Sequence, residues 1–438
     1  MFYRKISKKI EEYFNNPSSP ILMIDGARQI GKTYIIRYMA QQRFENYIEI
    51  NMYDDLVGDK LFKNVNTIES FYIQVSILAG NRLKDKENTI IFIDEIQVYP
   101  HLFTILKSLK KEDKYRYICS GSQLGIALKK TALIPMGSIN KVRMYPMDFE
   151  EFLLANGIGS NVIKYLEENY INRKSLDDAI HNKILGLFKT YLYVGGLPDA
   201  VKSYVYNKNV VEIKNVQLQT MEYYVDDAIK YDENNKLKIA RMYNMLPSYI
   251  DNKVKRFQIN KIEDKDNARF TKYQNEFDYL LASGITLGAN AISDPKFPLI
   301  QSSMKNLIKL YYNDVGLLSC VLYKNNVNAI LNDNVNINLG AVYENFVAQE
   351  LSAHGHTLYY FDKRKLGEVD FLVDDYDDLS ITPIEVKSGK DYMNYRALPK
   401  LVSEDIYKVN KGYVLSNNKE VFEKDNIIHL PIYYSMFL

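Results

Sequence analysis

The pattern of apolar and polar residues divides the chain into a strand-rich first third, a helical middle and a mixed last third. Five short apolar runs in the first third have the composition of buried strands, and helix-like segments separate them. The segment after the first run, for example, places Ile35, Ile36 and Ala40 on one helical face. We therefore expect an α/β unit with a five-stranded parallel sheet. The expected strands are residues 21–25, 47–52, 88–97, 115–122 and 140–147.

A helical pattern replaces the strand pattern from about Pro146 onward. A Gly-Gly-Leu-Pro sequence at residues 195–198 interrupts it and indicates a break between two helices. Two further amphipathic segments, around Met242 and Phe277, precede the strand-like runs "GITLGANAI" and "LIKLYYND". Helices followed by such a β-ribbon predict a winged-helix-like α+β arrangement, which can bind DNA or serve as a packing module. The expected domains are residues 1–150, 151–235, 236–325 and 326–438.

A glycine-containing motif follows the first expected strand and opens the first expected helix. It reads G-x-x-x-x-G-K-[ST] within "DGARQIGKTY", and a strand–loop–helix context is the one in which a phosphate-binding loop works. Its glycines allow successive N–H groups to converge on phosphate at the helix N-terminus. Lys32 would reach the β- and γ-phosphates of ATP, and the Thr33 hydroxyl would ligate Mg²⁺. The expected nucleotide-binding residues are Gly26, Ala27, Arg28, Gln29, Ile30, Gly31, Lys32, Thr33 and Tyr34.

Two carboxylates, Asp94 and Glu95, end the apolar run in "NTIIFIDEIQ". The carboxyl ends of parallel strands are where ligands bind in open α/β sheets. We expect Asp94 to hold Mg²⁺ through water and Glu95 to polarise the attacking water. A loop start with two solvated acids is the alternative, and the phosphate loop in the same chain argues against it. Ser120, Ser122 and Gln123 end another strand; we include Ser120 in the nucleotide site, with a small-residue turn as the alternative.

The segments "GARQIGKT", "IFIDEIQ", "SGSQLG", "YPMDFEEFL" and "YVGGLPDAV" together resemble the prokaryotic AAA-type ATPases usually described only as ATP-binding proteins. Their carboxy-terminal region is of unknown function. The resemblance spans nearly the whole chain and implies ATP and Mg²⁺ as cofactors. It also implies that the helical region 151–235 acts as a lid over the nucleotide. In AAA-type rings an arginine finger comes from a neighbouring subunit, so the resemblance is compatible with a homo-oligomer.

Two expected strands in the last third, "GEVDFLV" and "ITPIEVKSG", carry charged residues at alternating positions. Alternation places Glu368 with Asp370 on one face, and likewise Glu385 with Lys387. Such an acid cluster is costly unless a cation occupies it. Phosphodiester hydrolysis uses a cluster of this kind. Asp370 and Glu385 would hold Mg²⁺, while Lys387 would position the water that the metal activates and stabilise the transition state.

The helix "GAVYENFVAQELSAHG" places Glu344 at the edge of its buried face, from which it can point toward the same metal. A helix Glu, then Asp, then Glu-x-Lys resembles the PD-(D/E)xK restriction-endonuclease-like superfamily over about residues 340–420, with Val369 in place of the proline. The resemblance implies an α/β nuclease-like domain that acts on DNA. An ordinary cross-strand charge pattern is the alternative. The nearby His354 and His356 fit a helix-end turn better than a ligand set.

Composition and charge narrow the classes of function only slightly. The net charge of +2 argues against a protein coated in positive charge but allows a local basic groove. Basic residues concentrate between the two middle helices, where neighbouring acids make a solvated surface equally compatible. The chain has two cysteines without a CxxC pair and no run of roughly 18 apolar residues, so we expect a cytoplasmic protein without a membrane partner. The basic residues are Lys253, Lys255, Arg256, Lys261, Lys265, Arg269 and Lys272.

Two functions follow from these patterns. The first is a Mg·ATP-dependent AAA-type ATPase that is coupled to a nuclease-like module acting on DNA. The second is a nucleotide-gated DNA-binding or protein-interaction switch without nuclease activity.

Overall fold

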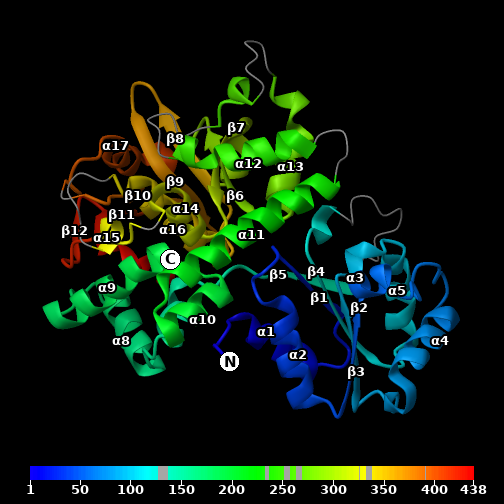
Figure 1. The fold of residues 1–438 in the computed structure, drawn as a ribbon. Helices are drawn as coiled ribbons and strands as arrows, with labels where there is room; N and C mark the ends of the chain where they lie inside the picture. Colours follow the sequence, from blue (N-terminus) through cyan, green and yellow to red (C-terminus); the bar gives the residue numbers. More distant parts are fainter. Residues whose placement is uncertain are drawn as a thin grey trace. The chain divides into compact units, whose positions relative to one another are not determined.

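The computed structural model describes residues 1–126, 137–231, 236–250, 257–262, 269–324, 326–331, 338–389 and 391–438. The chain forms two compact units (Figure 1). The first unit comprises Met1, Tyr3–Tyr145 and Ala282–Gly284, and the second comprises Phe2, Pro146–Leu281 and Ile285–Leu438. In the described ranges, none of the helices is long and apolar enough to cross a membrane.

The first unit is built on a five-stranded sheet in the order β2-β3-β4-β1-β5, in which every neighbouring pair is parallel. This confirms the expected parallel α/β sheet. The central strands β1, β3 and β4 are buried at every position, which explains their continuous apolar runs in the sequence. The strands are β1 (Ile21–Asp25), β2 (Asn46–Asn51), β3 (Thr89–Asp94), β4 (Arg116–Gly121) and β5 (Ile139–Arg143).

Helices and their apolar faces complete the core of this unit. Ile91 and Ile93 of β3 pack in one buried cluster with Phe71 of α4 and Leu106 of α5. Because β4 lies between β1 and β3, the loops that follow these three strands meet at the carboxyl edge of the sheet. The helices are α1 (Ile6–Asn15), α2 (Lys32–Arg43), α3 (Met52–Val57), α4 (Ile68–Ala79) and α5 (Leu102–Glu112).

The second unit contains a mixed sheet of eight strands in the order β12-β13-β11-β10-β9-β8-β6-β7. A mixed sheet agrees with the expected α/β character, whereas the restriction-endonuclease-like fold stays a prediction. The strands are β6 (Thr286–Ile292), β7 (Ser303–Tyr312), β8 (Leu358–Lys363), β9 (Gly367–Asp375), β10 (Ser380–Val386), β11 (Gly412–Ser416), β12 (Phe422–Lys424) and β13 (Ile427–Pro431).

Strand pairing joins two of the expected domains. β6 and β7 form the expected antiparallel ribbon, but β6 also pairs in parallel with β8. The expected boundary between residues 325 and 326 therefore falls within one sheet, and the ribbon of the expected winged helix continues the sheet of the expected nuclease-like region. The sequence pattern shows that a strand is amphipathic, but it does not show which strand accepts its backbone hydrogen bonds.

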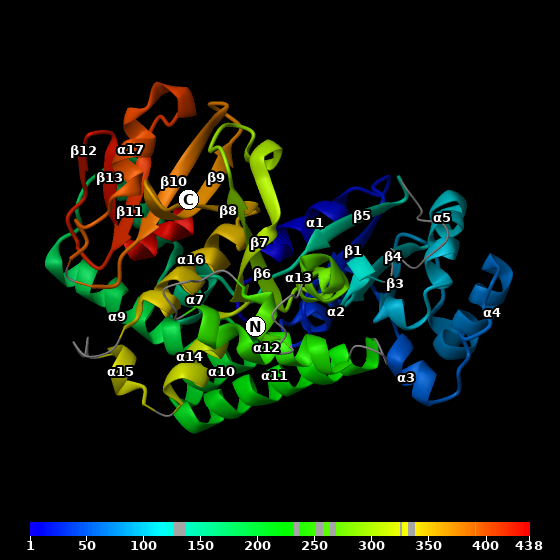
Figure 2. The same cartoon turned by 90° about the horizontal axis from the view of Figure 1, so that it is seen from above.

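Helix α16 packs against β6, β7, β8 and β10, and α17 packs against β9 and β10 (Figure 2). Helices α9 and α14 contact each other and α16, and α11 contacts α10, α12 and α14. The helices of this unit are α7 (Phe149–Ala155), α8 (Ser160–Ile171), α9 (Asp178–Val194), α10 (Pro198–Asn207), α11 (Val210–Tyr231), α12 (Lys236–Ile250), α13 (Gln274–Ala282), α14 (Val315–Tyr323), α15 (Asn328–Leu331), α16 (Gly340–Ala353) and α17 (Ala397–Ser403).

A buried carboxylate, Asp314, connects the glycine break after α9 to the start of α14. Its Oδ2 accepts a hydrogen bond from the Gly196 backbone N–H at 2.5 Å, and its Oδ1 accepts one from the Gly316 N–H at 3.0 Å. A Cβ atom at Gly195 would lie 2.1 Å from Asp314 Oδ1, so only glycine fits there. Burial raises the pKa of Asp314 from 3.8 to about 6, although the backbone N–H groups oppose this shift.

The raised pKa of Asp314 predicts a pH-dependent stability. Between pH 3.8 and about 6 the unfolded chain loses the Asp314 proton while the folded chain keeps it, so this contribution is lost as pH rises. We expect the unfolding free energy of wild type, relative to Asp314→Asn, to fall by roughly 2 kcal/mol between pH 4 and pH 7. Urea unfolding at both pH values measures it. The exposed Asp199→Asn serves as control, and a pH-independent difference would contradict the assignment.

Candidate nucleotide site

The loop between β1 and α2 has the backbone conformation that its two glycines permit. Gly31 adopts a left-handed conformation with φ 89° at the N-cap of α2. A Cβ atom at Gly26, which has φ 155°, would lie 2.4 Å from the Met144 carbonyl oxygen. Neither position accepts a larger residue without a shift of the loop. The sequence therefore brings a tight loop to the N-terminus of α2, where backbone N–H groups favour an anion.

Lys32 is buried and closes over this loop. Its Nζ donates hydrogen bonds to the carbonyl oxygens of Gly26 at 3.0 Å and Ala27 at 2.7 Å. Burial lowers the pKa of the Lys32 ammonium, and the carboxylates of Glu95, Asp94 and Asp25 act in the opposite direction. The ammonium is therefore held at the loop, where phosphate oxygens can replace the two carbonyl groups as its partners.

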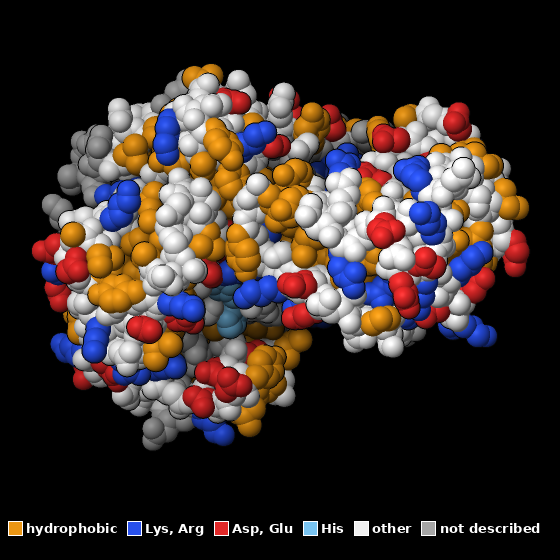
Figure 3. Space-filling model, turned by 90° about the horizontal axis from the view of Figure 1, so that it is seen from below, with side chains coloured by type: hydrophobic (Ala, Val, Ile, Leu, Met, Phe, Trp, Pro, Cys, Tyr) orange, Lys and Arg blue, Asp and Glu red, His pale blue; other side chains and the backbone are white. Residues whose placement is uncertain are grey.

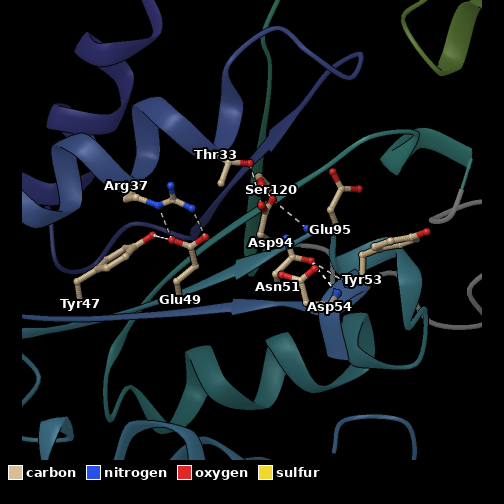
Figure 4. A network of polar contacts seen from close by, with 10 residues as sticks. All are labelled: Thr33, Arg37, Tyr47, Glu49, Asn51, Tyr53, Asp54, Asp94, Glu95 and Ser120. Carbon is tan, nitrogen blue, oxygen red and sulfur yellow. Dashed lines mark hydrogen bonds and ion pairs between the residues drawn. The ribbon is translucent and has the colours of Figure 1, made fainter. Parts of the chain in front are cut away.

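Asp94 lies at the centre of a hydrogen-bond network at the end of β3 (Figure 4). Its Oδ2 accepts a hydrogen bond from Thr33 Oγ1 at 2.8 Å, and its Oδ1 accepts from Ser120 Oγ and from the Glu95 N–H. Burial raises the pKa of Asp94, and the Ser120 hydroxyl opposes this shift. Three donors fix the carboxylate next to Thr33, so a hydroxyl and a carboxylate suited to Mg²⁺ are neighbours.

Glu95 follows Asp94 and has a left-handed backbone with φ 52°. Its Oε2 accepts hydrogen bonds from the side chains of Gln97 and Ser122, the latter at 3.3 Å. Gln97 Nε2 also donates to Ser122 Oγ at 3.3 Å. The structure thus places Ser120 against Asp94 and Ser122 against Glu95. Gln97 was not expected at the site because its role depends on the turn after β3, which no sequence period reveals.

A second residue set that the sequence did not predict lies beside the loop. Asp25, the last residue of β1, is 2% exposed and pairs with Lys141 Nζ of β5 at 2.8 Å. Its other oxygen accepts a hydrogen bond from the Leu124 N–H at 3.2 Å. Asp25 therefore links the phosphate loop to the neighbouring strand and to the loop after β4.

The remaining residues of the expected nucleotide set differ in exposure. Ala27 and Ile30 are buried, so their backbone groups are what these residues offer to a ligand. Tyr34 is 57% exposed. Gln29 is exposed with φ 65°, and Arg28 is half-buried.

An ion pair connects α2 to the edge strand β2 (Figure 4). Arg37 donates through Nε and Nη2 to the two oxygens of Glu49, at 2.8 and 2.6 Å. The Tyr47 hydroxyl donates to the same carboxylate at 2.5 Å. This bidentate pair joins β2 to the helix whose first turn carries Lys32 and Thr33.

In the second unit, the expected Asp and Glu-x-Lys positions lie side by side. Asp370 Oδ2 accepts a hydrogen bond from the Val386 N–H at 2.9 Å, and Glu385 Oε1 accepts one from Lys387 Nζ at 2.7 Å. Glu344 is 1% exposed. Its neighbours along α16 are buried as well, so Glu344 does not lie at the edge of a buried face, where it was expected. Within the parts of the chain that the structure describes, no group of three or more acids, histidines or cysteines is arranged to hold a metal ion.

The expected basic surface falls mostly outside the described residues, since Lys253, Lys255, Arg256 and Lys265 lie there. On the face shown in Figure 3, Lys and Arg side chains are interspersed with Asp and Glu side chains and do not gather into one large basic area. His354 is the C-cap of α16, and its Nδ1 lies 3.0 Å from the Leu438 carbonyl oxygen, as expected for a helix-end residue.

Comparison with protein families identifies the first unit. Residues 18–153 match the family described as "AAA domain". These residues are similar to AAA-type P-loop domains. The rest of the chain matches two families described only as domains of unknown function, DUF8612 over residues 185–328 and DUF4143 over residues 339–434. The resemblance to AAA-type ATPases is thereby confirmed for the first unit. The families of the second unit give no support to its nuclease-like assignment.

Individual relatives add little to this identification. An uncharacterized protein of Methanocaldococcus jannaschii is 26% identical over 246 residues, which cover 50% of each protein. The chain thus spans about half the length of that curated relative. The Thermotoga maritima RuvB Holliday junction branch migration motor is 14% identical, with a TM-score of 0.30 over 65% of this chain and 89% of that one. C. elegans PCH-2 is 13% identical, with a TM-score of 0.25 over 64% and 69%. TM-scores this low do not establish a shared fold.

Proposed function

We propose that the first unit binds ATP with Mg²⁺ and hydrolyses it. The hydrogen bond between Thr33 and Asp94, next to the loop that Lys32 closes, carries the proposal. Thr33 and Asp94 would hold Mg²⁺, which neutralises charge on the β- and γ-phosphates when bound. Lys32 would leave the two loop carbonyls and contact phosphate. The Glu95 carboxylate would first give up its hydrogen bond from Gln97 or Ser122 and accept one from the attacking water. It would then accept a proton from that water.

Phosphate release from ATP by the full chain tests this proposal. We expect turnover with Mg²⁺ and none when EDTA removes the metal. Binding of a fluorescent ATP analogue without any turnover would contradict hydrolysis, and an absence of both would contradict the whole proposal. The separate roles of Lys32 and Glu95 make the two strongest predictions, which are developed in the Discussion.

The second candidate function is Mg²⁺-dependent cleavage of DNA at Asp370, Glu385 and Lys387. The hydrogen bond from the Val386 N–H to Asp370 favours it, because this bond places Asp370 beside the Glu-x-Lys strand. A nucleotide-gated DNA-binding or protein-interaction switch without nuclease activity is the alternative. Self-assembly, as in AAA-type rings, would suit either function.

Cleavage of single- and double-stranded DNA with Mg²⁺ or Mn²⁺ distinguishes the two. If the domain is a nuclease, Glu385→Ala and Lys387→Ala should each abolish cleavage, because the metal ligand or the charge that positions water is lost. The exposed Lys400→Ala in α17 should leave it unchanged. Wild-type chain that binds DNA without cutting it would favour the switch.

A further inference from the structure

A lysine of the β-ribbon lies inside the carboxylate cluster of the second unit. Lys309 of β7 is 2% exposed, and its Nζ lies 2.6 Å from Glu368 Oε1 of β9 and 3.2 Å from Glu344 Oε1 of α16. The Tyr311 hydroxyl donates to the same Glu344 oxygen at 2.5 Å. The Lys309 ammonium also lies 4.6 Å from the centre of the Tyr360 ring. This group of residues, the Lys309 cluster, connects four secondary structure elements.

The charges in the Lys309 cluster require a cation. Glu344 is 1% exposed, and an unpaired carboxylate at that depth is strongly disfavoured. Burial raises the pKa of Tyr311 well above its usual value, and Glu344, Asp370 and Glu368 add to the shift, so the tyrosine stays a neutral donor. The ammonium of Lys309 is therefore the positive charge that the structure places on both Glu344 and Glu368.

The same position is the one that a divalent cation between these carboxylates would need. Mg²⁺ requires oxygen ligands at about 2.0–2.1 Å in an octahedral arrangement. Glu344 Oε1 and Glu368 Oε1 instead accept hydrogen bonds from Lys309 Nζ. An ammonium group and a metal ion cannot occupy the same position. The Tyr360 ring next to the Lys309 ammonium adds a cation–π attraction, which is stronger for a cation that is partly desolvated.

We propose that Lys309 takes the place of a divalent cation between Glu344 and Glu368. Glu344 is then a counterion of Lys309 and not a metal ligand, and the second unit keeps this acid cluster assembled without metal. A Mg²⁺- or Mn²⁺-binding site forms there only when Lys309 is removed. This inference does not depend on ATP hydrolysis by the first unit.

Binding of Mn²⁺ to the full, nucleotide-free chain tests the proposal. All proteins carry Asp94→Asn, which removes the carboxylate of the candidate cation site in the first unit, and free Mn²⁺ is followed by electron paramagnetic resonance. We expect Lys309→Met to bind one more Mn²⁺ than its parent. Adding Glu344→Gln should remove that ion. Lys305→Met, exposed on the same strand, is the matched control and should behave as the parent.

Thermal unfolding keeps the test decisive if Lys309→Met folds poorly. We expect this variant to lose roughly 5–15 °C of melting temperature, because a buried carboxylate loses its partner. Either Mn²⁺ or a second change, Glu344→Gln, should restore part of the loss. Mn²⁺ binding by the parent that Glu344→Gln abolishes would overturn the proposal. So would a Lys309→Met protein that binds no more Mn²⁺ than Lys305→Met.

Discussion

Glu95→Gln should abolish ATP hydrolysis while ATP still binds. The amide cannot accept a proton from water, and general-base catalysis typically contributes about 10²–10⁴ in rate. The change keeps the size of the side chain, and its amide oxygen can still accept from Ser122 and Gln97. We therefore expect the turnover rate to fall by that factor. The dissociation constant of an ATP analogue should stay within a few-fold of wild type.

Single-turnover phosphate release and titration with a fluorescent ATP analogue measure the two effects separately. Glu87→Gln, an exposed residue before β3, is the matched control and should keep full turnover. Glu95→Gln with wild-type turnover would show that another group accepts the proton. The assignment of Glu95 would then be wrong even if the chain hydrolyses ATP.

Lys32→Ala should weaken nucleotide binding itself. The ammonium is the buried cation of the loop, and each charge-assisted hydrogen bond contributes about 1.5–3 kcal/mol, so its removal should raise the dissociation constant for ATP by roughly 10- to 100-fold. Binding of ADP should also weaken where the lysine contacts the β-phosphate. Isothermal titration calorimetry with ATP and ADP measures both affinities.

Removal of Lys32 also frees the carbonyl groups of Gly26 and Ala27, which could disturb the loop. Lys32→Arg therefore accompanies Lys32→Ala, because it keeps the charge but changes the geometry. Lys111→Ala, exposed in α5, controls for a general loss of positive charge. Unchanged ATP affinity in a folded Lys32→Ala protein would contradict the nucleotide site as a whole.

The five-stranded parallel sheet of the first unit was predictable because its signals are local. Buried parallel strands appear as uninterrupted apolar runs, and β1, β3 and β4 are buried at every position. The loop was predictable because Gly26 and Gly31 occupy backbone conformations that other residues avoid. Asp94 follows directly from its strand, since a carboxylate at the carboxyl end of such a strand is a common ligand position.

Most of the contacts that were not predicted join residues that are distant in sequence. Asp25 of β1 pairs with Lys141 of the neighbouring strand β5. Lys309 of β7 pairs with Glu344 of α16 and Glu368 of β9. Sequence periodicity tells which face of an element is buried, but it does not tell which face of another element covers it. The parallel pairing of β6 with β8 escaped prediction for the same reason, because the hydrogen-bonding partner of β6 is selected in three dimensions. The winged-helix arrangement itself stays a prediction.

The pairing of β6 with β8 has a consequence for the order in which the second unit forms and for the fragments that can be made from it. β6 is synthesised before β8, so its parallel pairing with β8 can form only after residues 358–360 have been synthesised. A fragment that starts at residue 326 would leave one side of β8 without backbone partners. Exposed strand edges of this kind recruit other chains. A recombinant fragment meant to contain the two carboxy-terminal families should therefore begin near Pro146, where the main part of the second compact unit begins.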